Sequence, residues 1–339
     1  MTKNAGVGYI NGRFEKALML EGPDPTLADY LRDQGIEPHR VDTLDEDDVV
    51  ALLEEHQHDL LYKRSGFIVN ERVLQASDNL AAIMLCCIGD DSVDKRACAR
   101  EGVLVMNDPI SNGWSVVELV YGEMITLARR VFEASRHTQK SEWTKDNVHR
   151  YELRDKSLSI IGLGNIGKQV AKMAESFHMN VNFYDNDEVA QEVGSTLGWN
   201  ACDSLSEAFR EGDFVTVHVS AEDHRGHSNE GLLNYEDHFS QLGANRPDNS
   251  PRVFLNASRG FLYDPGDLIR AVEEEQIRYA AVDVYPEEPG SKGEAWSNPY
   301  ADVPHIENTP HIGAATQEAQ PRIAKHMATC STTLRIEWP

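Results

Sequence analysis

The chain has 339 residues, enough for about two domains at roughly 150 residues each. It is 40% hydrophobic, so it can build a sizeable core, which excludes wholesale disorder. Its 56 acidic residues against 32 basic ones give a formal charge of −24. That balance argues against nucleic acid or an anionic membrane as a partner, because both require a basic face.

No stretch of about 18 apolar residues occurs, so no membrane span is predicted. The first residues, "MTKNAGVGYINGRFEK", lack the apolar segment of a signal peptide and indicate a short extension. The five cysteines are odd in number and form no CxxC pair, so neither a disulfide framework nor a zinc site is predicted. We therefore expect no metal, and a protein of the reducing cytoplasm.

Short apolar stretches alternate with amphipathic ones between Ala17 and Met106. The predicted strands are 17–20, 59–64, 80–87 and 103–106. This alternation is typical of a parallel sheet covered by helices.

Residues 115–135 are apolar on more than one face, which predicts one buried helix joining two domains or two subunits. The polar stretch 136–156 indicates a linker, and 316–335 a final helix. Between them a second alternating series predicts a second α/β domain. Its strands are 158–162, 181–185, 214–220, 252–258, 279–285 and 305–310.

The stretch "GLGNIG" (162–167) follows an apolar strand and opens a helix. Gly162 permits the tight turn, Gly164 lets the backbone approach a pyrophosphate, and Gly167 lets helix pack against strand. Asn165 and Ile166 complete the helix N-terminus that would face the phosphates. A second strand ends at Asp185, whose carboxylate can bind an adenosine ribose and repels a 2′-phosphate. The sequence therefore predicts NAD as cofactor in preference to NADP.

Four polar residues stand at or near the ends of later strands: Arg259 in "NASRG", Asp283 and Glu288 in "AVDVYPEEP", and His311 in "TPHIGAAT". Ligands of doubly wound sheets bind at the carboxyl ends of strands. An imidazole can protonate the alkoxide formed by hydride transfer to a carbonyl, and a carboxylate on its other nitrogen would raise its pKa. An arginine can hold a substrate carboxylate with two hydrogen bonds.

These motifs, with "RSG" (64–66) and "SVVELVYGE" (115–123), resemble the D-isomer-specific 2-hydroxyacid dehydrogenases from about Ala17 to Arg335. The resemblance implies that Arg259 binds the α-carboxylate and carbonyl, and that Glu288 pairs with His311, the acid/base. It also implies that Asp283 holds the nicotinamide carboxamide beside Gly313.

The resemblance implies two doubly wound parallel-sheet domains, Rossmann-like and flavodoxin-like, with a cleft between them. The NAD-binding domain would be 113–308, and the substrate domain 1–112 with 309–339. Family members are dimers through the cofactor domain and the helix near 115–135. A homodimer is therefore expected, with a higher homo-oligomer left open.

Within the family the motifs look most like the phosphoglycerate dehydrogenase type, whose substrate carries a phosphate and a carboxylate. An acidic chain must gather cations at both ends of such a substrate. We expect Arg64 at the phosphate, with backbone N–H groups of Ser65 and Gly66, and Lys145 reaching it from a neighbouring subunit. Alternatively, Arg64 is a solvated strand-end residue and Lys145 a linker charge.

The sequence departs from the family pattern at three places. Phe67 stands where threonine is common, Ser220 where proline is common, and 242–251 is an insertion expected to form a surface loop. The chain also ends soon after the last predicted helix, so the serine-sensing domain of many phosphoglycerate dehydrogenases is not expected in it. That this sequence is part of a longer protein stays open. A glyoxylate or hydroxypyruvate reductase, or an NADH-sensing binding protein of the same fold, remains an alternative function.

Overall fold

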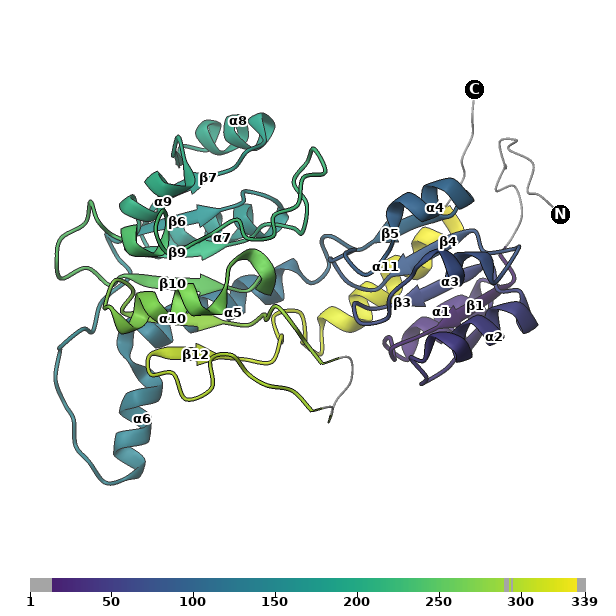
Figure 1. Cartoon of the computed structure of the whole chain (residues 1–339), viewed down its shortest axis with the longest axis horizontal. Helices are drawn as coiled ribbons and strands as arrows, with labels where there is room; N and C mark the ends of the chain where they lie inside the picture. The colour runs from purple at the N-terminus through teal and green to yellow at the C-terminus, as the bar shows by residue number, and fades with distance from the viewer. Residues whose placement is uncertain (1–13, 290–292, 294, 334–339) are drawn as a thin grey trace. The chain divides into compact units, whose positions relative to one another are not determined.

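The computed structural model describes residues 14–289, 293 and 295–333. The chain forms two compact units: unit 1 is Met1–Asn112 with Thr316–Pro339, and unit 2 is Gly113–Ala315. Each unit is a parallel sheet with helices on both faces (Figure 1), so the prediction of two doubly wound α/β domains is confirmed.

The sheet of unit 1 has the order β2-β1-β3-β4-β5, the flavodoxin-like order. Its strands are β1 (Lys16–Met19), β2 (Glu37–Arg40), β3 (Leu60–Lys63), β4 (Ala82–Leu85) and β5 (Leu104–Asn107). We did not predict β2 because its sequence, EPHR, is polar. It lies at the edge of the sheet, where a proline is tolerated.

Helices cover both faces of this sheet. α2 (Glu46–His56), α3 (Glu71–Gln75) and α4 (Lys95–Glu101) share one apolar cluster with the strands. α1 (Thr26–Asp33) and α11 (Ala319–Thr333) share the other. Ile323 and Met327 of α11 are fully buried in this second cluster, so the last helix completes the core of the N-terminal sheet.

The sheet of unit 2 has the order β12-β11-β10-β9-β6-β7-β8. Successive strands are added on one side of β6 up to β8 and on its other side from β9 onwards, so the strand order reverses between β6 and β9. Its strands are β6 (Ser157–Ile161), β7 (Asn180–Tyr184), β8 (Asn200–Ala201), β9 (Phe214–Val217), β10 (Val253–Asn256), β11 (Tyr279–Val282) and β12 (Ile306–Asn308). We did not predict the two-residue β8. The central strands β6, β9 and β10 are mostly apolar, and all of their residues are buried, as expected for a covered parallel sheet.

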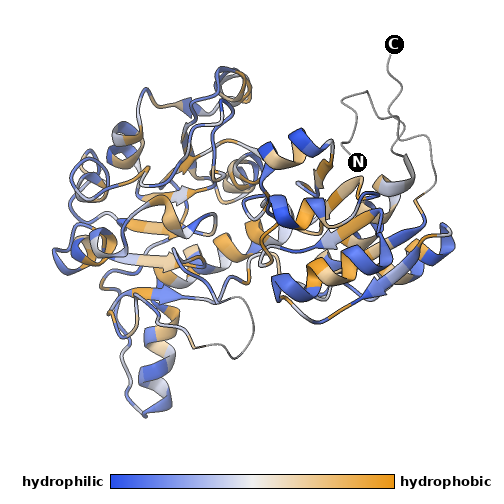
Figure 2. Cartoon of the chain, turned by 45° about the vertical axis from the view of Figure 1, so that its right-hand side comes forward, coloured by the Kyte–Doolittle hydropathy of each residue, from blue (hydrophilic) through white to orange (hydrophobic). Residues whose placement is uncertain are grey.

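α5 (Gly113–Arg129) and α7 (Asn165–Ser176) pack on one face of this sheet. α9 (Leu205–Glu211) and α10 (Pro265–Glu273) pack on the other, and α8 (Glu188–Thr196) follows β7. Two short 3₁₀ helices, η1 (Phe239–Gln241) and η2 (Gly260–Leu262), lie in the connections. Figure 2 shows apolar residues concentrated on the strands and hydrophilic ones on the outer helix faces. No helix in the described ranges is long and apolar enough to cross a membrane.

The prediction of one helix over 115–135 is wrong. α5 ends at Arg129, Arg130 adopts a left-handed conformation (φ 52°), and α6 (Val131–Gln139) starts afresh. The Arg130 guanidinium stabilises this break between the two helices, because it donates hydrogen bonds to the Glu133 carboxylate and to the Val148 carbonyl (2.7 Å). α6 buries none of its residues and projects from unit 2 (Figure 1).

The second predicted domain boundary also differs from the structure. We placed the return to the N-terminal domain at residue 309, whereas residues 309–315 belong to unit 2. The insertion at 242–251 is held in place rather than loose, because Gly243 and Asn245 donate backbone hydrogen bonds to the carbonyls of Phe209 and Arg210.

Candidate active site

The glycine turn after β6 has the geometry that its sequence predicts. Gly162 has φ +89°, and a Cβ atom there would lie 2.6 Å from the His218 carbonyl oxygen. A Cβ on Gly167 would lie 2.1 Å from the Gly162 carbonyl oxygen. Gly164, the N-cap of α7, has open space where its Cβ would be. The turn therefore needs two glycines for packing and leaves room above the third at a helix N-terminus.

Asp185 connects this turn to the end of β7. Its Oδ2 accepts the N–H of Leu163 (2.7 Å), and its Oδ1 accepts the N–H of Asp187 (2.9 Å). Asp187 in turn caps α8 by accepting the N–H of Val189 (3.0 Å). The structure thus brings Asp185 to the glycine turn, with lone pairs left for ribose hydroxyls.

Arg259 lies in the turn between β10 and η2. The Asn256 side chain shapes this turn by accepting the N–H of Ser258 (3.0 Å) and donating to the Arg259 carbonyl (2.9 Å). A Cβ on Gly260 would lie 1.9 Å from the Tyr285 carbonyl carbon, so only glycine allows this turn to meet the chain after β11. The close approach brings Arg259 near enough to act electrostatically on Glu288 and His311.

Asp283 follows β11 and anchors the segment 309–313. Its Oδ1 accepts the Thr309 hydroxyl (2.6 Å) and the Ile312 N–H (2.8 Å), and its Oδ2 accepts the Gly313 N–H (2.8 Å). Burial raises the pKa of Asp283, although these hydrogen bonds oppose the shift. They also explain why 309–315 stays with unit 2, and sequence reasoning missed this anchoring role.

His311 and Glu288 form the predicted pair. His311 Nδ1 lies 2.6 Å from Glu288 Oε2, and Glu288 Oε1 accepts the N–H of Tyr285 (3.1 Å). The hydrogen bond to Glu288 raises the pKa of His311, against the opposite effect of burial. Burial works against ionisation of Glu288, but the hydrogen bond and charge of His311 outweigh it and lower the pKa of Glu288. The imidazole is therefore oriented and biased towards its protonated form.

Residues 121–313 match the model of the D-isomer specific 2-hydroxyacid dehydrogenase, NAD binding domain. The chain belongs to this family. The match covers the glycine turn, Asp185 and the four polar residues at the later strand ends, so NAD is the cofactor of unit 2.

Among curated relatives, the chain is 35% identical to D-3-phosphoglycerate dehydrogenase 2 of Saccharomyces cerevisiae over 322 residues, 92% of this chain and 65% of that protein. It is 33% identical to D-3-phosphoglycerate dehydrogenase of Escherichia coli K12 over 316 residues, 92% of this chain and 73% of that protein. The chain thus spans somewhat less than two thirds of the yeast relative.

Solved structures of similar fold include the TT0316 protein of Thermus thermophilus, with a TM-score of 0.76 and 25% identity, covering 92% of this chain and 94% of that one. A glyoxylate reductase from Paecilomyes thermophila has a TM-score of 0.77 at 19% identity, covering 93% and 94%. The second likeness shows the fold alone.

The predicted substrate loop of unit 1 differs from expectation. Glu21, at the end of β1, accepts the backbone N–H groups of Arg64 (2.7 Å), Gly66 (2.5 Å) and Phe67 (3.1 Å). The protein therefore uses its own carboxylate where we expected Gly66 to donate to a substrate anion. Phe67 is buried in the core of unit 1, which explains an apolar residue at that place.

Lys63, the last residue of β3, lies fully buried beneath this loop. Its ammonium donates to the Arg64 carbonyl (2.5 Å) and the Ser92 hydroxyl (2.6 Å), and lies 3.8 Å from Glu21. Burial lowers the pKa of Lys63, and the Glu21 charge opposes that shift. A lysine that ends the apolar run "LLYK" was the sequence signal for this support.

Lys145 lies in the exposed stretch that follows α6. The structure does not bring it to the cluster formed by Arg259, Asp283, Glu288 and His311. Its expected role involves a second subunit and stays a prediction.

The pairing of His311 with Glu288 predicts a measurable change in titration. Replacing Glu288→Gln should lower the pKa of His311, because a neutral amide stabilises the imidazolium less than a carboxylate does. The His311 ring can be followed by NMR across pH. Glu287→Gln, a change at the neighbouring carboxylate, is the control and should leave the titration in place. An unchanged His311 titration in Glu288→Gln would show that the pair is not formed in solution.

Proposed function

We propose that the protein is an NAD-dependent dehydrogenase of D-2-hydroxy acids. The observation that carries this proposal is the oriented His311–Glu288 pair, with Arg259 near enough to act on both, in the same unit as the NAD-binding turn. When bound, the nicotinamide would supply or accept the hydride. The NAD pyrophosphate would be held by the glycine turn, Gly162, Gly164, Asn165, Ile166 and Gly167. Asp185 would bind the adenosine ribose of NAD.

In the reducing direction the chain's own residues handle the carboxylate and the proton. Arg259 would grip the substrate carboxylate and polarise the neighbouring carbonyl. His311, as imidazolium, would give its proton to the oxygen that becomes the hydroxyl. Glu288 stabilises the imidazolium before that transfer, and in the oxidising direction the neutral imidazole would take the proton back.

The substrate that we propose is D-3-phosphoglycerate, oxidised to 3-phosphohydroxypyruvate in serine synthesis. Support comes from the relatives in yeast and Escherichia coli that bear this activity in their names. Further support is charge placement. Arg259 would bind the carboxylate. Arg64 and the Ser65 N–H would bind the phosphate, together with Lys145 from a second subunit. The five cysteines, all within the described residues, form no disulfide, which fits the cytoplasm as the place of action.

One observation favours a reductase of glyoxylate or hydroxypyruvate instead. Glu21 already takes the N–H groups of Arg64 and Gly66, which leaves fewer donors for a phosphate in unit 1. An NADH-sensing binding protein would have no need for the His311–Glu288 pair, so turnover separates that alternative from both enzymes.

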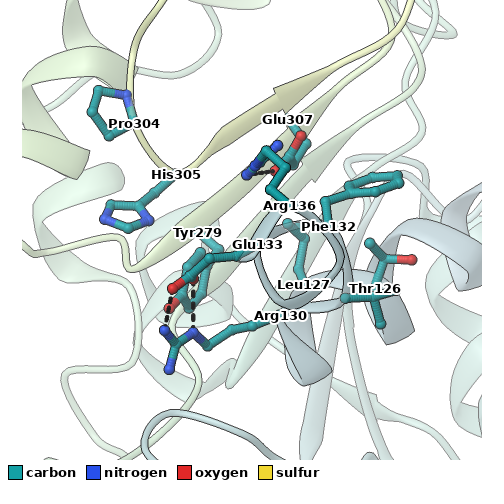
Figure 3. A pocket seen from close by; sticks show the side chains of 11 residues that line it. Thr126, Leu127, Arg130, Phe132, Glu133, Arg136, Tyr279, Pro304, His305 and Glu307 are labelled. Carbon is teal, nitrogen blue, oxygen red and sulfur yellow. Dashed lines mark hydrogen bonds and ion pairs between the residues drawn. The ribbon is translucent and has the colours of Figure 1, made fainter. Parts of the chain in front are cut away.

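We also propose that the protein forms a homodimer through α6 and the surface beside it. Val131 and Phe132 of α6 are 45% and 49% exposed. They line a groove with Leu127, Tyr279 and His305, next to the Arg136–Glu307 ion pair (3.2 Å; Figure 3). Exposed apolar side chains around a groove are typical of a protein–protein interface, and a second copy of the chain would cover them.

The activity test is a panel of 2-oxo acids with NADH or NADPH, followed at the nicotinamide absorbance. We expect the fastest turnover with 3-phosphohydroxypyruvate and NADH, because Asp185 repels a 2′-phosphate. His311→Ala should lower kcat by roughly 10² to 10⁴, the usual loss for a general acid, with little change in NADH affinity. Binding of NADH without turnover of any 2-oxo acid would favour the sensing alternative.

Arg64→Ala should raise KM for 3-phosphohydroxypyruvate much more than KM for hydroxypyruvate. A hydrogen bond to a charged group contributes about 1.5–3 kcal/mol, or roughly one to two orders of magnitude in KM. Arg100→Ala, a surface change in the same unit, is the control. An equal effect of Arg64→Ala on both substrates would remove the phosphate site and leave the reductase.

The dimer can be tested by sedimentation of the wild-type chain and of Phe132→Asp. A charge in an apolar interface should shift the dimer towards monomer. Val189→Asp, which changes an exposed apolar residue of α8, should sediment like wild type. A dimer that survives Phe132→Asp unchanged must use another surface.

A further inference from the structure

Glu123 lies on α5, beside the anchored segment that carries His311. Its Oε2 atom is buried and has no hydrogen-bond partner within the described residues. Its carboxyl group lies within hydrogen-bond reach of the Thr309 side chain and close enough to Asp283 to feel its charge. A second carboxyl group, from the last residue of the stretch 115–123, thus stands near Asp283, and the mechanism above does not use it.

Thr309 has a single hydroxyl hydrogen to share between these two carboxyl groups. The hydroxyl donates it to Asp283 Oδ1 (2.6 Å). Its oxygen can then accept a hydrogen bond from Glu123 only if Glu123 carries a proton. Asp283 has two further donors, the N–H groups of Ile312 and Gly313, so Asp283 is the group better suited to bear the negative charge.

The electrostatics of the surroundings agree with this assignment. Burial, and next the negative charge of Asp283, raise the pKa of Glu123 to about 8. A hydrogen bond donated by Thr309 would lower this pKa, but Thr309 donates its one hydrogen to Asp283. Asp283 and the Tyr285 hydroxyl interact electrostatically with Glu123, and neither is a cation. His311 interacts with Asp283, and His311, Glu288 and Arg259 interact with one another.

We propose that Glu123 is a positioning residue that carries a proton at neutral pH. Through Thr309 this proton keeps Asp283 as the single anion that holds the segment 309–313, and with it His311, in place. The inference deepens the proposed function, because it concerns the geometry of the proposed acid/base. The protonation state of Glu123 in the folded chain can also be measured without substrate.

The proposal implies a loss of activity at alkaline pH. Ionised Glu123 would compete for the Thr309 hydrogen and place a second negative charge beside Asp283, which would loosen the segment. The oxidising direction isolates this effect: neutral His311 is the active form there, so its titration raises the rate with pH. A fall of kcat above about pH 8 would then report Glu123.

Glu123→Gln tests the proposal, because an amide donates to Thr309 and cannot ionise. We expect its oxidation kcat at pH 7 to stay within about twofold of wild type, and the alkaline fall to disappear. Glu118→Gln, an exposed position on the same helix, is the matched control and should keep the fall. An alkaline fall that is identical in wild type and Glu123→Gln would overturn the proposal.

Unfolding by urea gives a readout without substrate. Folded Glu123 keeps its proton between its ordinary value of 4.5 and about 8, while the unfolded chain releases it. Wild-type stability should therefore fall with rising pH across that window relative to Glu123→Gln, by up to about tenfold in the unfolding constant per pH unit. Parallel stability profiles of the two proteins would refute the protonated state even if the enzyme is active.

Thr309→Val is the second variant, should Glu123→Gln not fold. It removes the hydroxyl and keeps the volume, so Asp283 loses one donor and kcat should fall at least tenfold at all pH values. Unchanged kcat in Thr309→Val would overturn the proposed hydrogen bonding of Glu123 to Asp283 through Thr309. If no 2-hydroxy acid is oxidised at all, the proposed function fails, and the urea profiles still decide the state of Glu123.

Discussion

The buried carboxylate of Asp283 is the interaction on which the rest of the candidate site depends. A buried charge is costly unless hydrogen bonds satisfy it, and Asp283 is satisfied by a hydroxyl and two backbone N–H groups from 309–313. Those three bonds fix a short segment of irregular backbone next to β11. Because His311 lies inside that segment, the hydrogen bonds to the Asp283 carboxylate also determine the position of the imidazole.

The parallel sheet supplies the second condition. β10 and β11 are neighbours, so the residues that follow them, Arg259 and Asp283, emerge at the same edge. Gly260 then allows the turn after β10 to touch Tyr285, whose N–H binds Glu288. Arg259, Asp283 and Glu288 come together because each lies a few positions after the end of its strand. Gly260 lets the loops after the two strands come into contact.

This logic explains which parts could be predicted from the sequence. The glycine turn and Asp185 follow from strand ends and residue chemistry, and the pairing of His311 with Glu288 was expected from the family resemblance. The break at Arg130 could not be seen, because Val131 and Phe132 continue the apolar pattern while remaining exposed. The use of the Gly66 N–H by Glu21 and the place of Glu123 depend on long-range packing. A pattern read along the chain carries no information on such contacts.

The acidity of the chain places its own demand on such a site. Carboxylates around it would weaken the binding of an anionic substrate unless their charge were offset locally. The structure offsets them with short-range donors: backbone N–H groups for Asp185 and Asp283, and an imidazole for Glu288. Hydrogen bonds at these distances are screened by salt far less than surface charges several ångströms apart. A strongly acidic protein can thus keep carboxylates as structural elements next to the arginine that its proposed substrate requires.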